Sequence, residues 1–374
     1  MKQTAISERL NIFADVLEIL CARIPFADDR PLCWTIIANP TAGRFVGPSR
    51  WKEIRKLLEE YRNKADRNPL RSYPASPSRT ALLRGDELGG KGLIPTTGPG
   101  HAEKIVGSVI AEAEEETAPF HLIIAAGGDG TNLEVLTGLY RLPQALKSRF
   151  AVLRLPLGTG NDGADGWSLD VALDRLIFPG PVAFSRALQL KTAAPGKTPV
   201  LAFNILSVGL DAFVTGMTNK MKRYMPGDSY KLWVDIAALF YDRIYRVGEL
   251  DVNAFDEKGA LVKSIREKTL LLAMGVTGKR TYGSHKWILP DERNVCAVKQ
   301  MPLLRKIALK ELFYTGAHVH KPESTLFTAA KVTFQGDNPI LAQMDGETLL
   351  LKPADFPASI ELTEPVIPVL TMAE

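Results

Sequence analysis

The chain has few cysteines and no long apolar run. Its three cysteines, Cys21, Cys33 and Cys296, are odd in number and have no paired spacing, which argues against a disulfide scaffold or a zinc site and predicts a reducing compartment. No apolar run reaches the ~18 residues that a membrane-spanning helix needs. Acids such as Glu8 and Glu18 interrupt the N-terminal apolar residues, unlike a signal peptide. We therefore expect a cytoplasmic protein that meets a membrane only at its surface.

Neither sign of charge dominates the sequence. The chain has 46 Lys and Arg against 42 Asp and Glu, a net charge of +4. This excess suits an anionic nucleotide or an anionic membrane surface and specifies neither. We expect no nucleic-acid partner, and the sequence leaves the oligomeric state open, a homodimer included. The 374 residues, 45% of them hydrophobic, are enough for two domains with their own cores.

Three short apolar runs each end in a polar turn that contains glycine. These turns follow residues 34–38, 121–126 and 153–157, and they consist of Asn39, Pro40, Thr41, Ala42 and Gly43; of Gly127, Gly128, Asp129, Gly130 and Thr131; and of Gly158, Thr159, Gly160, Asn161 and Asp162. A strand that breaks into a glycine turn and opens a helix can hold phosphate, because glycine lets the backbone approach and the helix N-terminus adds positive partial charge. In an open parallel sheet such turns share one carboxyl edge. The sequence therefore predicts a nucleotide or phosphate site.

Asp129 is an unusual residue for a loop that only binds phosphate. Its negative charge indicates a metal, a ribose or a substrate hydroxyl beside the phosphate. The alternative is a tight strand-to-helix turn with an aspartate cap, although three glycines around one aspartate exceed what a turn requires.

In this order the three turns resemble the catalytic domain of the diacylglycerol kinase and sphingosine kinase superfamily. Residues 204–212 resemble the family's segment from an asparagine to Gly-x-Asp-Ala, and residues 344–347 resemble its Asp-Gly-Glu signature. The resemblance spans roughly residues 33–370. It implies an ATP- and Mg²⁺-dependent lipid kinase of phospholipid biosynthesis, which phosphorylates a hydroxyl of diacylglycerol or a similar lipid at the membrane surface.

The resemblance also implies roles for individual residues. The residues expected at the nucleotide are Asn39, Pro40, Thr41, Gly43, Thr96, Thr97, Gly127, Gly128, Gly130, Thr131, Gly158, Thr159 and Asn161. Thr96 and Thr97 both match a threonine near the phosphates, and both also suit a helix cap. Asp129 is expected to bind Mg²⁺ and to act in catalysis, and Glu347 to be the general base. In sphingosine kinases the aspartate that matches Asp129 is favoured as the base, and Glu347 also suits a simple Asp-Gly hairpin turn.

Two segments depart from the family pattern. Residues 163–167 lack the usual aromatic-Ala-Arg sequence and place Asp165 at the basic position, and residues 289–295 lack the Asp-Asp-Gly-like Mg²⁺ turn. A sphingoid-base kinase, a soluble-substrate kinase of the NAD kinase kind and a degenerate nucleotide- or lipid-binding regulator therefore remain alternatives. Outside the motifs, we expect His318 and His320 on one face of a surface strand.

The predicted fold is a three-layer α/β nucleotide-binding domain followed by a β-rich, antiparallel sandwich-like domain, with the active site in the cleft between them. An N-terminal helical extension covers residues 1–30. The α/β domain covers 31–180 and contains an exposed insertion at 62–95. The β-rich lipid-substrate domain covers 181–350, and residues 351–374 are expected to return to the first domain.

Overall fold

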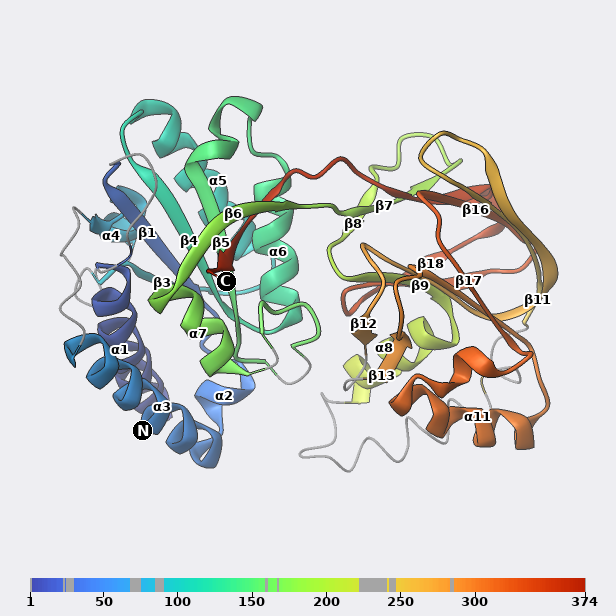
Figure 1. Cartoon of the computed structure of the whole chain (residues 1–374), viewed down its shortest axis with the longest axis horizontal. Coiled ribbons are helices and arrows are strands. Elements are labelled where there is room, and N and C mark those ends of the chain that lie inside the picture. The colour runs from blue at the N-terminus through green and yellow to red at the C-terminus, as the bar shows by residue number, and fades with distance from the viewer. Residues whose placement is uncertain are drawn as a thin grey trace. The chain divides into compact units, whose positions relative to one another are not determined.

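The chain forms two compact units in the computed structural model (Figure 1). The first unit contains residues 1–185 and 365–374, and the second contains residues 186–364. The structure describes residues 2–22, 24, 30–67, 75–84, 91–158, 161–166, 168–221, 241, 247–282 and 286–373. Thr159 and part of the expected insertion lie outside these residues. Over the described ranges, no helix has the length and apolar character needed to cross a membrane.

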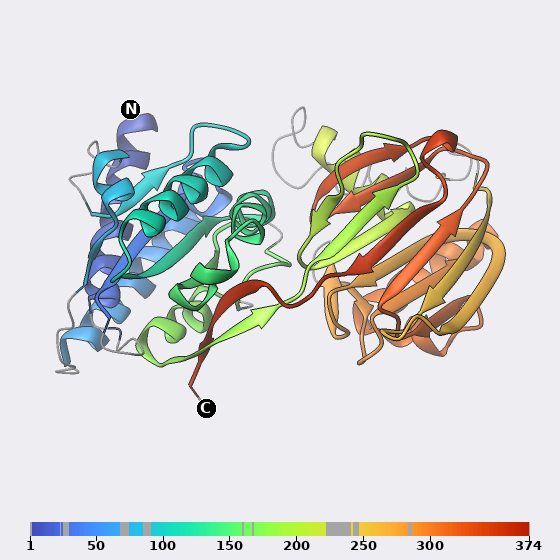
Figure 2. The same cartoon turned by 90° about the horizontal axis from the view of Figure 1, so that it is seen from above.

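A mostly parallel sheet forms the centre of the first unit. Its strands, in spatial order, are β2 (Ala75–Pro77), β1 (Leu32–Ala38), β4 (Phe120–Gly127), β5 (Phe150–Pro156), β20 (Ile367–Met372) and β6 (Pro179–Ser185), and β3 (Leu93–Pro95) also pairs with β1. Among the described strands of this sheet, only the β20–β6 pair is antiparallel, and it brings the C-terminal strand beside β6 (Figure 2). Every residue of β1 and β4 is buried, as expected for parallel strands covered on both faces.

Helices cover both faces of this sheet. One face packs against α1 (Lys2–Cys21), α3 (Pro48–Arg67) and α7 (Leu169–Ile177), and the other against α4 (Arg79–Arg84), α5 (His101–Glu115) and α6 (Asp129–Tyr140). The short elements α2 (Gly43–Val46) and η3 (Gln144–Arg149) complete the unit. Leu10, Phe13 and Leu17 of α1 are buried because their helical spacing places them on one face. The predicted three-layer arrangement is confirmed.

The second unit is a curled, antiparallel β structure. Its main sheet runs in the order β18 (Glu347–Leu351), β17 (Ile340–Met344), β9 (Ile205–Gly209), β11 (Leu261–Gly275), β10 (Glu249–Phe255), β16 (Lys331–Gln335), β19 (Ala358–Leu362), β7 (Leu188–Thr192) and β8 (Val200–Ala202). The sheet curls along β11, since residues 261–268 of that strand pair with β10 and residues 271–275 with β9. The predicted antiparallel β-rich unit is confirmed.

Two further strands extend this sheet, since β14 (Val295–Lys299) pairs with β11 and β15 (Ser324–Phe327) pairs with β14. The other described elements of the second unit are the hairpin β12 (Arg280–Tyr282) and β13 (Lys286–Leu289), the helices α8 (Leu210–Met221) and α11 (Leu303–Thr315), and the turns η4 (Ala317–His320) and η5 (Pro353–Asp355). The prediction of a surface strand around His318 and His320 is wrong. Gly316 ends α11 with a φ of 77°, and a 3₁₀ turn follows in which His318 is buried and stacks on Phe313.

Asp165, at one of the departures from the family pattern, lies in a buried ion cluster of the first unit. Its carboxylate is 2.7 Å from Arg154 Nη2 and 3.3 Å from Arg175 Nη1, and it accepts the backbone N–H of Arg154 at 2.6 Å. Only 2% of the Asp165 side chain is exposed. The acid thus joins β5 to α7.

Replacing Asp165 with alanine should destabilise the protein by about 3 kcal/mol, because two arginines would lose their shared buried partner. Denaturant unfolding followed by circular dichroism measures this change. The control is Glu59→Ala in the exposed Arg55–Glu59 pair of α3, which should cost less than about 0.5 kcal/mol. Equal losses in the two variants would contradict a stabilising role for the cluster.

Candidate functional site

The predicted turns meet at the carboxyl edge of the first unit's sheet. In the strand register, Ala38 of β1 lies opposite Pro95 of β3 and Ala126 of β4. Gly127 of β4 in turn lies opposite Pro156 of β5. The segments that follow these four strands are therefore neighbours, as parallel pairing requires.

The second and third glycine turns are in backbone contact. A Cβ atom added to Gly158 would lie 2.4 Å from the Cα of Gly128, and one added to Gly128 would lie 3.1 Å from the Cα of Gly158. The Leu157 N–H also donates to the Gly127 carbonyl at 2.9 Å. Any larger residue at Gly158 would push the two turns apart, so glycine is required here by close approach.

Asp129 fixes the third turn from the second. Its carboxylate accepts the backbone N–H of Asn161 at 3.1 Å and that of Gly163 at 3.3 Å. Asn161 has a φ of 62°, in the left-handed region that asparagine tolerates, and its side-chain oxygen accepts the Gly158 N–H at 2.7 Å. One aspartate and one asparagine thus determine how the two glycine turns face each other.

The N-terminus of α6 begins at this point and has groups suited to an anion. No side chain caps the helix, so its first backbone N–H groups are not used by a capping residue. A Cβ atom at Gly130 would meet nothing within 4 Å, which indicates open space in front of the first turn. Asn132 is buried, and its side-chain amide has no hydrogen-bond partner within the described part of the chain. Such a group usually marks a place for water or ligand.

The other predicted residues occupy the same edge with different contacts. Asn39 accepts hydrogen bonds from the N–H and the hydroxyl of Thr41, at 2.9 and 2.8 Å, and Pro40 lies between them. Gly43 is the first residue of α2. The Thr96 N–H donates to the Ala38 carbonyl at 2.7 Å.

Thr97 and Thr131 are the last two described members of the predicted set. The Thr97 N–H donates to Nδ1 of His101 at 3.0 Å, so Thr97 holds the entry to α5. Thr131 is buried in the first turn of α6, where its hydroxyl packs against Gly127. The structure therefore brings the described members of the predicted phosphate set to one edge.

Asp129 is compatible with Mg²⁺ as a single protein ligand. Mg²⁺ in phosphate-transferring sites is bound by one or two carboxylates together with substrate phosphates, and Asp129 lies where the glycine turns meet. Among the described residues, no group of three or more His, Cys, Asp or Glu side chains is arranged to bind a metal. Residues 289–295 are the second segment that departs from the family pattern. In this segment Asp291 pairs with Arg293, and Glu292 pairs with Lys279 at 2.5 Å.

The two later motifs lie side by side within the second unit. Strand β9 pairs with β17, which places Leu206 opposite Met344. Asp345 follows β17 in a two-residue turn with Gly346, with φ values of 45° and 103°, and its carboxylate accepts the backbone N–H groups of Phe203, Asn204 and Ile205. Asp345 therefore fixes the segment that leads into β9. Glu347 begins β18 beyond this turn and is exposed.

Asp211 occupies the first turn of α8, directly after β9. Its carboxylate accepts hydrogen bonds from the Ser207 hydroxyl at 2.7 Å and from Nε2 of Gln343 at 3.3 Å. Burial raises the pKa of Asp211 above its ordinary value, while the Ser207 hydrogen bond and the Lys286 ammonium act in the opposite direction. The sequence pattern contains Asp211 but did not single it out.

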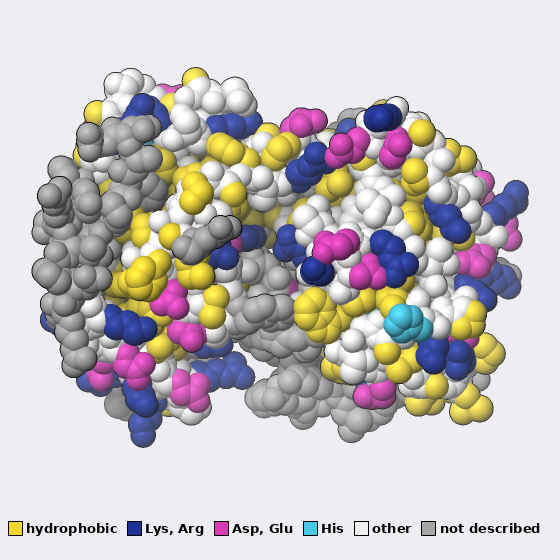
Figure 3. All heavy atoms as spheres, viewed as in Figure 1, with side chains coloured by type: hydrophobic (Ala, Val, Ile, Leu, Met, Phe, Trp, Pro, Cys, Tyr) yellow, Lys and Arg dark blue, Asp and Glu magenta, His cyan; other side chains and the backbone are white. Residues whose placement is uncertain are grey.

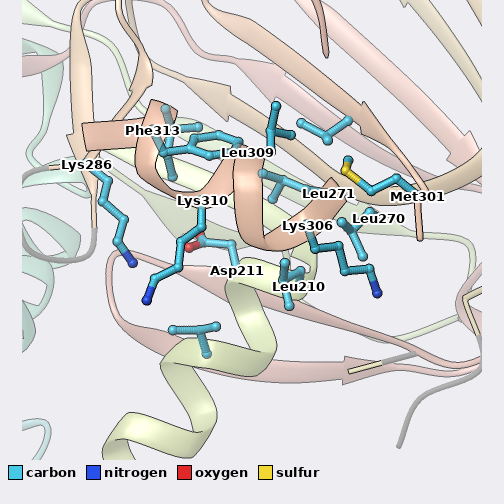
Figure 4. Close-up of a pocket in the computed structure, with 13 residues that line it drawn as sticks. Leu210, Asp211, Leu270, Leu271, Lys286, Met301, Lys306, Leu309, Lys310 and Phe313 are labelled. Atoms are coloured by element: carbon cyan, nitrogen blue, oxygen red, sulfur yellow. The ribbon is translucent and has the colours of Figure 1, made fainter. Parts of the chain in front are cut away.

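An apolar cavity of about 130 Å³ lies beside Asp211 (Figure 4). Its walls are formed by Leu210, Val214, Leu270, Leu271, Ile288, Val298, Met301, Leu309 and Phe313. The polar residues at the cavity are Asp211, Lys286, Lys306 and Lys310. An apolar cavity with a few polar groups is typical of a site for a small hydrophobic ligand. None of the three lysines was predicted, because they come from β13 and α11, far from the motifs in the sequence.

Comparisons with known proteins identify both units. Residues 89–177 match the diacylglycerol kinase catalytic domain, and residues 204–370 match the YegS C-terminal NAD kinase beta sandwich-like domain. The first match contains two of the glycine turns, and the second contains the motifs around Asp211 and Glu347. The chain belongs to the diacylglycerol kinase-like family of lipid kinases.

Individual relatives agree with this assignment. A protein named "Putative lipid kinase YtlR" from Bacillus subtilis (strain 168) is 25% identical over 326 residues, which cover 84% of this chain and 93% of that protein. The structure of a diacylglycerol kinase from Bacillus anthracis str. Sterne has a TM-score of 0.52 at 13% identity, and a second one from that organism, described as a "putative diacylglycerol kinase", has 0.54 at 16%. Each covers 90% of this chain and 96% of its own, and shows that the fold is shared.

Gly158→Ala should weaken nucleotide binding by about 10-fold or more, because separating the glycine turns misplaces donors to charged phosphate oxygens. Isothermal titration calorimetry with ATP measures the effect. Gly107→Ala in α5 is the control, since a Cβ atom there meets nothing within 4 Å. Unchanged affinity in a folded Gly158→Ala protein would contradict the assignment of these turns to phosphate.

Proposed function

We propose that the protein is an ATP- and Mg²⁺-dependent lipid kinase that transfers the γ-phosphate of ATP to a hydroxyl of diacylglycerol or a similar lipid. One observation carries the proposal. The chain combines a glycine-turn edge suited to phosphate with an apolar cavity that is also lined by the carboxylate of Asp211. A phosphate site alone would suit many nucleotide-binding proteins, whereas the cavity supports an acceptor with a hydrophobic part.

The first unit supplies the donor site in this proposal. Phosphoryl transfer depends mainly on positioning and on neutralising charge at the transferring group. The N–H groups at the start of α6 and the closely packed backbones of Gly128 and Gly158 are suited to hold the phosphates. Asp129 would hold Mg²⁺, which neutralises negative charge on the phosphate oxygens when it is bound.

The second unit supplies the acceptor site. The aliphatic and aromatic walls of the cavity suit an acyl chain, and the Asp211 carboxylate can accept a hydrogen bond from a lipid hydroxyl. Glu347, exposed after the Asp345-Gly346 turn, is the proposed general base. Lys286, Lys306 and Lys310 around the cavity disfavour the cationic amine of a sphingoid base, so a neutral or anionic lipid is the favoured acceptor.

A lipid panel tests this function. Purified protein is incubated with γ-labelled ATP and Mg²⁺, together with diacylglycerol, sphingosine or NAD. We expect a labelled phospholipid from diacylglycerol, no product from the other two acceptors, and loss of the product when EDTA removes the metal. Labelled NAD phosphate would indicate a soluble-substrate kinase, and no product from any lipid would indicate a regulator without turnover.

Glu347→Gln should lower kcat by about 10²–10⁴-fold and leave ATP affinity nearly unchanged, because a base acts in the chemical step. Steady-state kinetics with diacylglycerol separates the two effects. Glu257→Gln is the control, an exposed acid of the same unit that pairs with Arg186. Asp345→Asn should lower the stability of the second unit more than it lowers kcat, since Asp345 accepts three backbone hydrogen bonds.

Asp129→Asn should lower turnover by roughly 10²-fold or more, since it removes the charge directed at the metal and weakens the hold on Asn161 and Gly163. Turnover is measured over a range of Mg²⁺ concentrations. If Asp129→Asn were inactive while Glu347→Gln turned over normally, the base would be Asp129, as in the sphingosine kinase scheme. Normal turnover in both variants would overturn the mechanism.

A further inference from the structure

Helix α11 carries large apolar side chains on two opposite sides. Leu309 and Phe313 line the cavity. On the solvent side, Leu304 is 81% exposed, and Leu303 and Ile307 are also exposed. A surface helix normally shows a polar face to water, so an apolar solvent side indicates a further contact.

The exposed apolar residues lie on one side of the helix. At 3.6 residues per turn, Leu303, Leu304, Ile307 and Tyr314 fall within an arc of about 100°, and all four are exposed. These four residues are called the outer face of α11. Glu311 lies in the same arc. The space-filling view shows hydrophobic side chains gathered where α11 reaches the surface (Figure 3).

Ammonium groups border the outer face. Lys286 Nζ lies 5.5 Å from the ring centroid of Tyr314. Lys310, which is half-buried, lies on the same helix between the cavity side and the outer face (Figure 4). Apolar side chains flanked by lysines are the pattern of a helix that lies in an anionic membrane interface, where the apolar groups enter the acyl boundary and the ammonium groups meet lipid phosphates.

We infer that the outer face of α11 docks on an anionic lipid bilayer and brings the cavity, which the other side of α11 lines, to the lipid surface. This inference rests on the proposed function, because a lipid kinase must collect its acceptor from a membrane. The lysine border argues for a bilayer over a second copy of this chain, since a two-fold contact through this face would bring the lysines of both copies together.

Vesicle flotation without nucleotide tests the docking. Wild-type protein should float with phosphatidylcholine vesicles that contain phosphatidylglycerol and bind pure phosphatidylcholine less. In the double variant Leu304→Ser, Ile307→Ser, the affinity for the anionic vesicles should fall by about 10-fold or more. The matched control Leu261→Ser, Val262→Ser removes two exposed apolar side chains of β11 in the same unit and should bind as wild type does. Glu311→Gln should bind more tightly, because it removes an acid from the outer face.

Kinase assays separate this inference from the proposed function. The double variant should keep its activity on a dispersed short-chain diacylglycerol and lose it on long-chain diacylglycerol in vesicles. If the double variant floated with the anionic vesicles as well as the wild-type protein does, the docking inference would be overturned and the kinase assignment would stand. If the protein bound vesicles through α11 and phosphorylated no lipid, the docking inference would stand and the proposed kinase function would be refuted. A dimer in light scattering that the double variant dissociates would assign the outer face to a second copy and overturn the inference.

Discussion

The contact between the Gly128 and Gly158 backbones determines how the second and third glycine turns meet at the carboxyl edge of the first unit's sheet. Two strands of a parallel sheet lie side by side, and the turns that follow them would collide if either carried a side chain toward the other. Glycine at both positions lets the turns pack closely. The start of α6 and the third turn then lie side by side, and a phosphate can meet N–H groups from more than one segment.

Carboxylates that accept backbone N–H groups hold the irregular segments of both units. Asp129 accepts two such groups from the third glycine turn, and Asp345 accepts three from the segment before β9. A charged acceptor makes these hydrogen bonds stronger than neutral ones. Asp129 and Asp345 therefore each have a structural role, independently of any role in catalysis. A substitution at either position changes the loop and the charge together, so stability and turnover have to be measured on the same variant.

The sequence was sufficient to predict that the glycine turns meet at one edge of the sheet, because the determinants of this arrangement are local. Each glycine turn directly follows its own strand, and parallel pairing brings the ends of such strands together without further information. The role of Asp165 could not be predicted from its local sequence. The sequence showed only that an acid replaces a basic residue, whereas its function depends on Arg175, which the fold brings from α7. The cavity could not be predicted for the same reason, since its lining residues come from α8, β11, β13, β14 and α11, which lie far apart in the sequence.

The charges around the cavity bear on the choice of acceptor. Asp211 alone would attract a cationic amine, and its hydrogen bonds from Ser207 and Gln343 stabilise the ionised form against the cost of burial. Three lysines at the same cavity outnumber this one acid. Under the proposed function, this net positive charge would favour a lipid that offers a hydroxyl to Asp211 and either no charge or a negative charge to the lysines. Lys286 and Lys310 would also favour an anionic membrane as the source of that lipid, so two of the charges at the cavity would act on both the acceptor and the surface that supplies it.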